Sequence, residues 1–291
     1  MKVLERKDID VPRWDTMIWN ANNALFYNLS WSLDTLCVDW VAVMKDDYET
    51  ALAFPIKTKA GLKYTYNPFL FHRISTVGHW TEEEIDQAIW MVAKYVDVRI
   101  REEVEGAVSW NNCELELTNN YLETIQSYSS NAKRNIKKAV REGLVINEMN
   151  NAALISFFFK ENVSFNALGI KEKEYENFEK LMLEAFDCEV GHGFIVEKGE
   201  DVVAVGFFIE LNGRLTYVKG TSNEVGRSDG AMHFLFDRVI NKFSGQLKLL
   251  DFSGSDVDSV ATFYRSFGAE NKPIGYLKRN HLPFPLNHLK K

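Results

Sequence analysis

Short apolar runs separated by polar turns make up the first third of the chain. This pattern predicts a short helix over Pro12–Ala21. Thr81, followed three residues later by Glu84, forms a capping box that predicts a helix running to about Tyr95. Strands are expected at Cys37–Met44, Thr50–Lys57, Leu62–Tyr66, Val96–Ile100 and Cys113–Leu117.

The middle of the chain shows helical periodicity before strands return. A long helical stretch is expected from Asn120 to Glu142, and Gly143 stands where a helix C-cap usually lies. Asn212-Gly213 lies between two apolar runs, which is a strong hairpin signal. The pattern also predicts helices near Ala152–Ala167 and Lys173–Phe186, and strands at Gly193–Lys198, Val202–Leu211, Leu215–Lys219 and Leu247–Leu250.

Strands and helices interleave over the whole chain. Such an order is typical of an α/β or α+β protein with a mixed sheet. The 291 residues are enough for one large domain or two of ordinary size. We expect the boundary at Val145, which gives domains of residues 1–145 and 146–291.

The segment from Gly220 to Ala269 carries the most specific residues. The glycine-rich stretch 226–231 opens an amphipathic helix, and a strand and a second helix containing Tyr264 follow. A turn at a helix N-terminus presents free backbone N–H groups to an anion. This order is similar to that of the GNAT (acyl-CoA N-acyltransferase) superfamily. Members pair an Arg/Gln-x-x-Gly-x-Gly/Ala loop with a later Ala-x-x-Phe/Leu-Tyr-x-x-Phe-Gly segment.

A second resemblance lies in the basic segment Tyr128–Gly143. It is similar to a helix of the FemAB-like and CelD-like branch, whose members carry two such domains in tandem. The resemblance implies two tandem GNAT-like domains, each a mixed central sheet flanked by helices. The cations of this helix either grip an anionic substrate or form a solvated face; they are Lys133, Arg134, Lys137, Lys138 and Arg141.

The GNAT resemblance implies that the glycine-rich stretch binds the pyrophosphate of an acyl-CoA. The matching residues are Gly226, Arg227, Ser228, Gly230 and Ala231. Met232 stands where a final small residue is expected, and the Asp229 carboxylate repels phosphate unless it caps its own helix. The alternative is a capped helix without a CoA role.

Two residues are candidates for the chemistry. The resemblance implies that Tyr264 protonates the departing CoA thiolate. Because Tyr264 shares a helical face with apolar residues, it is equally explained as a core tyrosine. Asp251 ends an apolar strand, where its carboxylate could deprotonate or orient an acceptor amine. Alternatively, Asp251 or Ser255 caps the next helix.

Other residues are candidates for substrate contacts. Tyr217 and Lys219 are expected on one face of their strand, and Ser253 follows the strand that ends at Asp251. Aromatic residues of the first half either stack on a sugar or peptide acceptor or fill a core; they include Trp31, Trp40, Tyr64, Tyr66 and Phe69–Phe71.

Composition limits the partners. The formal net charge is −7, which disfavours a general nucleic-acid binder and weakens a tRNA-dependent mechanism without excluding it; no DNA partner is expected. All seven tryptophans precede Asn111, so the two halves have different cores. Three widely spaced cysteines, Cys37, Cys113 and Cys188, suggest reduced, mostly buried thiols and no metal site. The charged N-terminus and the absence of a long apolar run predict a cytoplasmic protein without a transmembrane segment.

The leading hypothesis is an N-acyltransferase. It would move an acyl group, for instance acetyl, from acyl-CoA to an amine of a small molecule or a cell-envelope precursor, by direct attack. One alternative is FemAB-like transfer from aminoacyl-tRNA to a cell-wall precursor peptide. Another is a non-catalytic descendant that binds a glycan or peptide. The sequence leaves the acceptor and the oligomeric state open.

Overall fold

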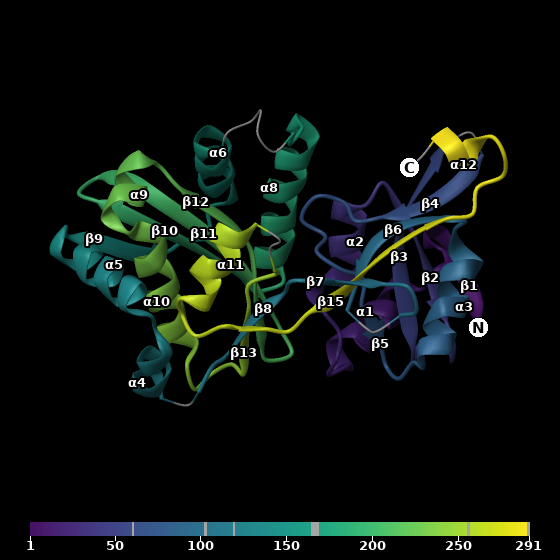
Figure 1. Ribbon diagram of the computed structural model, residues 1–291, viewed down its shortest axis with the longest axis horizontal. Coiled ribbons are helices and arrows are strands. Elements are labelled where there is room, and N and C mark those ends of the chain that lie inside the picture. The colour runs from purple at the N-terminus through teal and green to yellow at the C-terminus, as the bar shows by residue number, and fades with distance from the viewer. Residues whose placement is uncertain (60, 102–103, 119, 164–168, 255–256, 290–291) are drawn as a thin grey trace. The chain divides into compact units, whose positions relative to one another are not determined.

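The computed structural model describes residues 1–59, 61–101, 104–118, 120–163, 169–254 and 257–289. The chain divides into two compact units, labelled in Figure 1 by their elements. Unit 1 comprises Met1–Trp110 and Pro273–Lys291, and unit 2 comprises Asn111–Lys272. The expected boundary at Val145 falls inside unit 2, because the residues just before it supply a strand and a helix that pack with the second sheet.

Unit 1 is built on one mixed sheet with the strand order β1-β2-β3-β4-β6-β15-β7, and β5 pairs with β3. Its pairs are antiparallel except β4 with β6. The strands are β1 (Lys2–Glu5), β2 (Asp39–Met44), β3 (Ala51–Lys59), β4 (Leu62–Tyr66), β5 (Thr76–Val77), β6 (Tyr95–Ile100), β7 (Val108–Trp110) and β15 (Ile274–Asn280).

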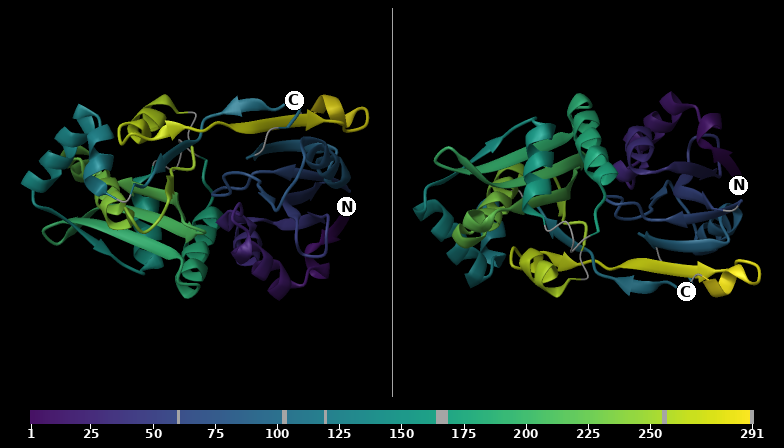
Figure 2. Two further views of the ribbon diagram at one scale, coloured as in Figure 1. Left: turned by 90° about the horizontal axis from the view of Figure 1, so that it is seen from below. Right: turned by 90° about the horizontal axis from the view of Figure 1, so that it is seen from above.

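The strand β15 was not expected from the sequence. It comes from the C-terminal end of the chain and inserts between β6 and β7 of unit 1, as both views of Figure 2 show. Tyr276 lies opposite Arg99 on β6 and Val108 on β7. Unit 1 is therefore discontinuous in sequence.

Two helices of unit 1 begin close to where the sequence pattern places them, whereas its other two described helices were not expected. The Thr81 capping box is confirmed, since its hydroxyl accepts from the Glu84 N–H and the Glu84 carboxylate accepts from the Thr81 N–H. The helices are α1 (Val11–Asn20), α2 (Ser30–Leu36), α3 (Glu82–Val92) and α12 (Leu286–Leu289), with the 3₁₀ turns η1 (Arg6–Asp8) and η2 (Phe26–Asn28).

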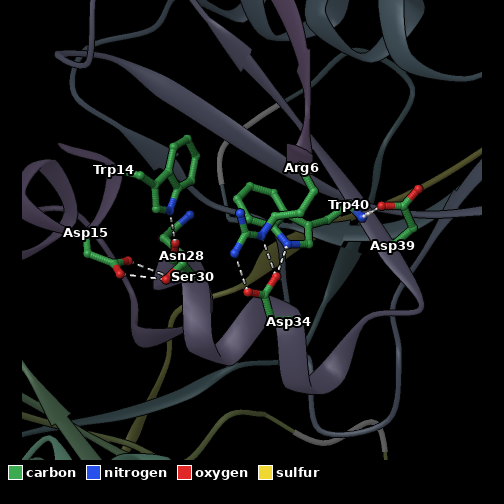
Figure 3. Close-up of polar contacts among 8 residues, drawn as sticks. All are labelled: Arg6, Trp14, Asp15, Asn28, Ser30, Asp34, Asp39 and Trp40. Carbon is green, nitrogen blue, oxygen red and sulfur yellow. Dashed lines mark hydrogen bonds and ion pairs between the residues drawn. The ribbon is translucent and has the colours of Figure 1, made fainter. Parts of the chain in front are cut away.

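Polar contacts hold α1 and α2 against β2 (Figure 3). Asp15 of α1 accepts from both the N–H and the hydroxyl of Ser30, where α2 begins. Asp34 of α2 binds the Arg6 guanidinium through both oxygens at 2.7 Å and accepts from the Trp40 indole at 2.7 Å. Trp40 is fully buried, so this tryptophan belongs to the core of unit 1.

Unit 2 has a second mixed sheet with the order β14-β8-β13-β12-β11-β10-β9. The expected Asn212-Gly213 hairpin joins β11 to β12, and β12 with β13 is the one parallel pair in its described residues. The strands are β8 (Cys113–Glu116), β9 (Leu144–Glu148), β10 (Gly191–Lys198), β11 (Asp201–Leu211), β12 (Arg214–Ser222), β13 (Leu249–Asp251) and β14 (Glu270–Asn271).

Helices pack on both faces of this second sheet. On β11, Phe208 contacts Phe236 of α10 (Ala231–Phe243), and the adjacent Phe207 contacts Phe178 of α8 (Glu172–Asp187). Successive strand residues point to opposite faces, so α10 and α8 lie on opposite sides of the sheet. The remaining helices are α4 (Tyr121–Thr124), the 3₁₀ turn η3 (Ile125–Ser127), α5 (Ser130–Arg141), α6 (Ala152–Asn162), α9 (Glu224–Asp229) and α11 (Asp258–Arg265).

Two expectations about helices differ from the structure, and a third lies outside the described residues. The long helix over 120–142 is broken, because Tyr128 and Ser129 are extended and Ser129 caps α5 as a new helix. The helix expected near Ala152–Ala167 ends at Asn162, and residues 164–168 lie outside the described residues. Ser255 and Asp256, expected at the start of the last helix of unit 2, also lie outside them.

The exposure of the cysteines and the lengths of the helices can be compared with the expectations from composition. The three cysteines form no disulfide with one another; Cys188 is exposed and Cys37 half-buried, so only Cys113 is a core thiol. Among the described helices, none combines the length and apolarity needed to cross a bilayer.

Candidate functional site

The sheet of unit 2 opens between its two parallel strands. The pairing of β12 with β13 ends at Thr216 and Asp251, whereas β12 continues to Ser222. Ser253 bridges the start of this opening, because its hydroxyl donates to the Tyr217 carbonyl at 3.0 Å. Backbone groups along the edge of an opened strand can bind a ligand.

The equivalent position in unit 1 is closed. There the parallel pair β4 and β6 is followed by a further parallel bridge between Ile74 and Ile100. The Ile74 N–H donates to the Arg99 carbonyl at 2.9 Å, and the Arg101 N–H donates to the Ile74 carbonyl at 2.9 Å. The open parallel pair therefore places the candidate site in unit 2, as the sequence motif suggested.

A β-bulge changes which residues of β12 face this opening. Tyr217 lies opposite Phe208, and Lys219 lies opposite Phe207, so Val218 is an extra residue. Cross-strand partners share a face, which puts Tyr217 on the α10 face and Lys219 on the α8 face. The expectation that Tyr217 and Lys219 share one face is wrong, because simple alternation does not reveal a bulge.

Tyr264 lies beside the opening on the α10 face. Its ring stacks on Phe252 with centroids 4.6 Å apart and approaches the Tyr217 ring at 6.4 Å. Tyr264 is only 7% exposed, and burial raises the pKa of its phenol. Burial also raises the pKa of Tyr217 well above its ordinary value, with the neighbouring Tyr264 contributing. Both phenols are therefore protonated at neutral pH.

Asp251 is buried on the opposite face and bound by other groups. Leu250 belongs to the same core as the α10 residues, so Asp251 points away from them. Its carboxylate lies 2.7 Å from the Arg214 guanidinium and accepts from the Ser253 N–H at 2.9 Å. Arg214 also binds Glu114 at 2.7 Å. Asp251 and Tyr264 are thus not brought together on one face, and Asp251 fixes the turn that carries Ser253.

Arg214 and Phe252 are missed by the sequence analysis. Arg214 follows the Asn-Gly turn directly, and Phe252 follows Asp251. A charged residue beginning an otherwise apolar strand was the available signal for Arg214. The stacking of Phe252 on Tyr264 depends on a turn and a helix that the sequence does not place relative to each other.

The glycine-rich stretch is folded as a helix where an open turn was expected. Its first part forms α9, capped by Asn223, whose carboxamide oxygen accepts from the Gly226 N–H at 2.8 Å. The Arg227 N–H donates to the Asn223 carbonyl, and the Gly230 N–H donates to the Gly226 carbonyl. The amides of Gly226, Arg227 and Gly230 are therefore already bonded, and Ala231 begins α10.

Asp229 does not cap its own helix. This buried carboxylate at the end of α9 accepts from Lys198 at 2.8 Å, and Lys138 of α5 lies 3.9 Å from it. Lys138 also donates to the Ser228 carbonyl at 2.7 Å. Asp229 thus connects α9 to β10 and α5, and a phosphate approaching from this side meets lysines as well as the carboxylate.

The cationic residues of α5 line an open groove. Its volume is ≈ 920 Å³, and Lys133, Arg134 and Lys137 lie along it with Lys138 and Arg141. Lys133 donates to the Gln126 carbonyl, and Arg134 to the Asn131 side chain. Within the described residues these two cations and Lys137 have no carboxylate partner. They are available to an anion.

No metal site is assembled in the described part of the chain. His192, which lies near Cys188 in sequence, is held between two carboxylates. Its Nδ1 lies 2.9 Å from Glu148 and its Nε2 3.4 Å from Glu210. The same Glu148 binds Lys242. This polar cluster joins three strands and α10.

Comparisons with known proteins agree on the fold. No family model and no curated protein matches the sequence. Solved structures do match: FemX (TM-score 0.67, 12% identity) covers 100% of both chains. The L-PGS of Bacillus licheniformis (TM-score 0.56, 11% identity) covers 96% of this chain and 95% of its own. A tandem GNAT protein from the clavulanic acid biosynthesis pathway (TM-score 0.54, 8% identity) covers 95% and 98%. The chain has the tandem GNAT-like fold, in the form that FemX also shows.

Proposed function

We propose that this protein is a transferase that moves an acyl group onto an amine at the opening between β12 and β13. The observation that carries the proposal is the protonated, buried phenol of Tyr264 beside that opening. The proteins similar in fold include FemX, an L-PGS and a tandem GNAT protein. An acyl transfer with an amine acceptor is the chemistry that fits both the fold and the phenol.

In the proposed reaction the neutral amine attacks the acyl carbonyl directly. A C–N bond forms, the bond to the leaving thiolate or ribose oxygen breaks, and Tyr264 donates a proton to the leaving atom. The proton that the amine loses passes to solvent. Asp251 is then a positioning residue, because it holds Ser253 and, through it, the Tyr217 carbonyl.

Acyl-CoA, for instance acetyl-CoA, is the first candidate donor. Arg227 would meet the pyrophosphate at the start of α10, together with Ser228, Gly230 and Ala231. Since the amides of Gly226, Arg227 and Gly230 are bonded internally, the side chain of Arg227 would carry most of this contact.

Aminoacyl-tRNA is a second candidate donor, favoured by two specific observations. The amides of Gly226, Arg227 and Gly230 are occupied, which removes part of the backbone cradle for a pyrophosphate. The groove of α5 instead offers Lys133, Arg134 and Lys137 to a phosphate backbone. The acceptor in either case would be an amine of a small molecule or of a cell-envelope precursor.

Thermal-shift titration of the whole chain separates the donors. Coenzyme A and acetyl-CoA are compared with aminoacyl-tRNA on the unmodified protein and on two variants, Arg227→Gln and Lys137→Gln. Binding at a hundredfold excess over Kd stabilises the native state by about 2.7 kcal/mol. A CoA shift lost only in Arg227→Gln supports acyl-CoA, and a tRNA shift weakened only in Lys137→Gln supports the second donor. No shift with either donor overturns the proposed function.

A further inference from the structure

One face of the unit 1 sheet carries a row of aromatic side chains. The strand registers put Tyr64 beside Tyr95, and Tyr66 beside Asp97, across β4 and β6. On β15, Tyr276 pairs with Arg99 of β6, which alternates with Asp97 and so shares its face. We call this surface the aromatic face; it comprises Tyr64, Tyr66, Tyr95, Tyr276 and Trp110.

The rings of the aromatic face make contacts in two groups. Trp110 of β7 lies 5.3 Å from Tyr276 of β15, with the rings tilted by 48°. On β4 and β6, Tyr64 lies 6.0 Å from Tyr66 and 6.4 Å from Tyr95. The half-buried rings of the two groups offer inclined apolar sides or edges to a ligand.

Most of this face lies outside the core. Tyr95 is buried, but Tyr64, Tyr66, Tyr276 and Trp110 are all half-buried, although each is a large aromatic residue. The alternate residues on the same strands, Thr65, Val98 and Leu277, have no exposed surface. The buried side of the sheet is therefore the opposite one, where Arg279 of β15 contacts Asp86 and Trp90 of α3. Half-exposed aromatics gathered on one face are characteristic of binding surfaces.

The face is also cationic. Lys57 is paired with Tyr64 and lies over the Tyr66 ring, with its Nζ 3.9 Å from the centroid. Lys59 shares the face with Lys57, and Lys278 lies opposite Asp97. In the described part of the chain these three lysines form no ion pair.

The one carboxylate of the described face is engaged by phenols. Asp97 accepts from the Tyr276 hydroxyl at 2.9 Å and from the Tyr95 hydroxyl at 3.5 Å. These bonds fix the two rings against the strand. The three lysines outnumber this one carboxylate, so the described face is net cationic and complementary to an anion.

We propose that the aromatic face of unit 1 binds an oligosaccharide that carries carboxylates, such as a chain of uronic acids. Pyranose rings stack their C–H faces on tyrosine and tryptophan, and the lysines pair with the carboxylates. This binding is separate from the acyl transfer proposed for unit 2 and needs no donor.

The spacing of the cations favours charges spread along a chain. Lys57 on β3 and Lys278 on β15 are separated by β4 and β6, which is about 14 Å at the usual strand spacing. A compact diphosphate prefers convergent donors, such as a bidentate arginine or a helix N-terminus. Stacked nucleobases prefer parallel ring faces, whereas the Trp110 and Tyr276 rings are tilted by 48°.

Calorimetric titration of the full chain with a hexamer of galacturonate tests the proposal. We expect binding that weakens with salt and falls roughly tenfold in Trp110→Ala. Lys57→Gln should lower affinity and reduce the salt dependence, while Tyr276→Phe keeps the ring and most of the binding. The matched control is Trp90→Ala, because Trp90 is an exposed tryptophan on the other side of the sheet.

Two further probes decide the ligand class. A neutral cellohexaose should bind more weakly than the galacturonate hexamer. The proposal is overturned if neither sugar binds, if Trp110→Ala and Trp90→Ala bind galacturonate equally, or if a single-stranded RNA hexamer binds more tightly and depends on Trp110. Circular dichroism and melting of each variant establish that it is folded.

Discussion

Nη1 of the Arg214 guanidinium lies 2.7 Å from the Asp251 carboxylate and 2.7 Å from the Glu114 carboxylate. These three residues come from β12, β13 and β8, which are neighbours around the opening of the unit 2 sheet. Asp251 has no exposed surface, so its charge depends on Arg214. The ion pair holds these three strands together. The proposed reaction requires β12 and β13 to separate only beyond Thr216.

Removal of Arg214 should therefore destabilise unit 2. Arg214→Met leaves a buried carboxylate without its cation, which typically costs about 3–5 kcal/mol. Urea unfolding followed by circular dichroism measures the loss. Lys173→Ala is the control, because Lys173 belongs to an exposed ion pair with Glu176 and its loss should not be resolvable. Equal stability of the two variants would show that Asp251 is neutral or solvated.

Gly230 joins α9 to α10 with a φ of 80° and faces α5 closely. A Cβ added there would lie 2.8 Å from the Asn135 carbonyl oxygen. We expect Gly230→Ala to cost more than the roughly 1–2 kcal/mol of left-handed strain. Gly143→Ala isolates the strain, since Gly143 has a φ of 75° and nothing within 4 Å of the added Cβ. Larger substitutions at Gly230 therefore test folding and not donor binding.

The quantity to measure is the difference in the free energy of unfolding between Gly230→Ala and Gly143→Ala. Thermal and urea unfolding should show Gly230→Ala to be the less stable. If both lose the same free energy of unfolding, the approach of α5 to α9 is looser than the structure has it.

Particular elements show how far the sequence determines this fold. The Thr81 capping box, the Asn212-Gly213 hairpin and the stop at Gly143 depend on neighbouring residues, so local pattern was enough to predict them. The pairing of β15 with β6 joins residues far apart in sequence, and no local signal specifies it. The domain boundary expected at Val145 therefore did not include the return of β15 to unit 1.

The candidate site shows the same limit. Tyr264 was selected because the motif around it is local, whereas its stacking on Phe252 depends on the tertiary structure. Lys219 was put on the wrong face because a single extra residue, Val218, inverts the alternation. Asp251 was read as a candidate base, but its partner Arg214 lies on another strand.

His233 should make the stability of unit 2 depend on pH. Its ring packs against Phe263 and Phe267, and burial lowers its pKa to about 4. The unfolded chain binds a proton on this histidine near its ordinary pKa, so between those two values the unfolded state holds more protons. Stability should then rise with pH across this window and fall as the medium becomes acidic.

Urea unfolding at several pH values between about 4 and 6.5 tests this prediction. His233→Leu removes the titrating group and should flatten the pH dependence of the free energy of unfolding over that range. If the variant and the unmodified protein have parallel profiles, His233 is protonated in the native state or its ring is solvated.

Tyr264→Phe is the test of the proposed acid. The change keeps the ring on Phe252 and removes only the hydroxyl, so the fold should be retained. Loss of a general acid typically lowers kcat by about 10² or more. Turnover is measured as thiol release from acetyl-CoA with a panel of primary amines, or as amine aminoacylation from charged tRNA.

The matched control for this test is Tyr175→Phe, since Tyr175 is also buried but packs against Phe159 of α6. The two variants should melt at similar temperatures and differ in kcat. An unchanged kcat in Tyr264→Phe, alongside active unmodified protein, would make Tyr264 a core residue. The leaving group would then take its proton from solvent, and the opening between β12 and β13 would serve only to position the donor.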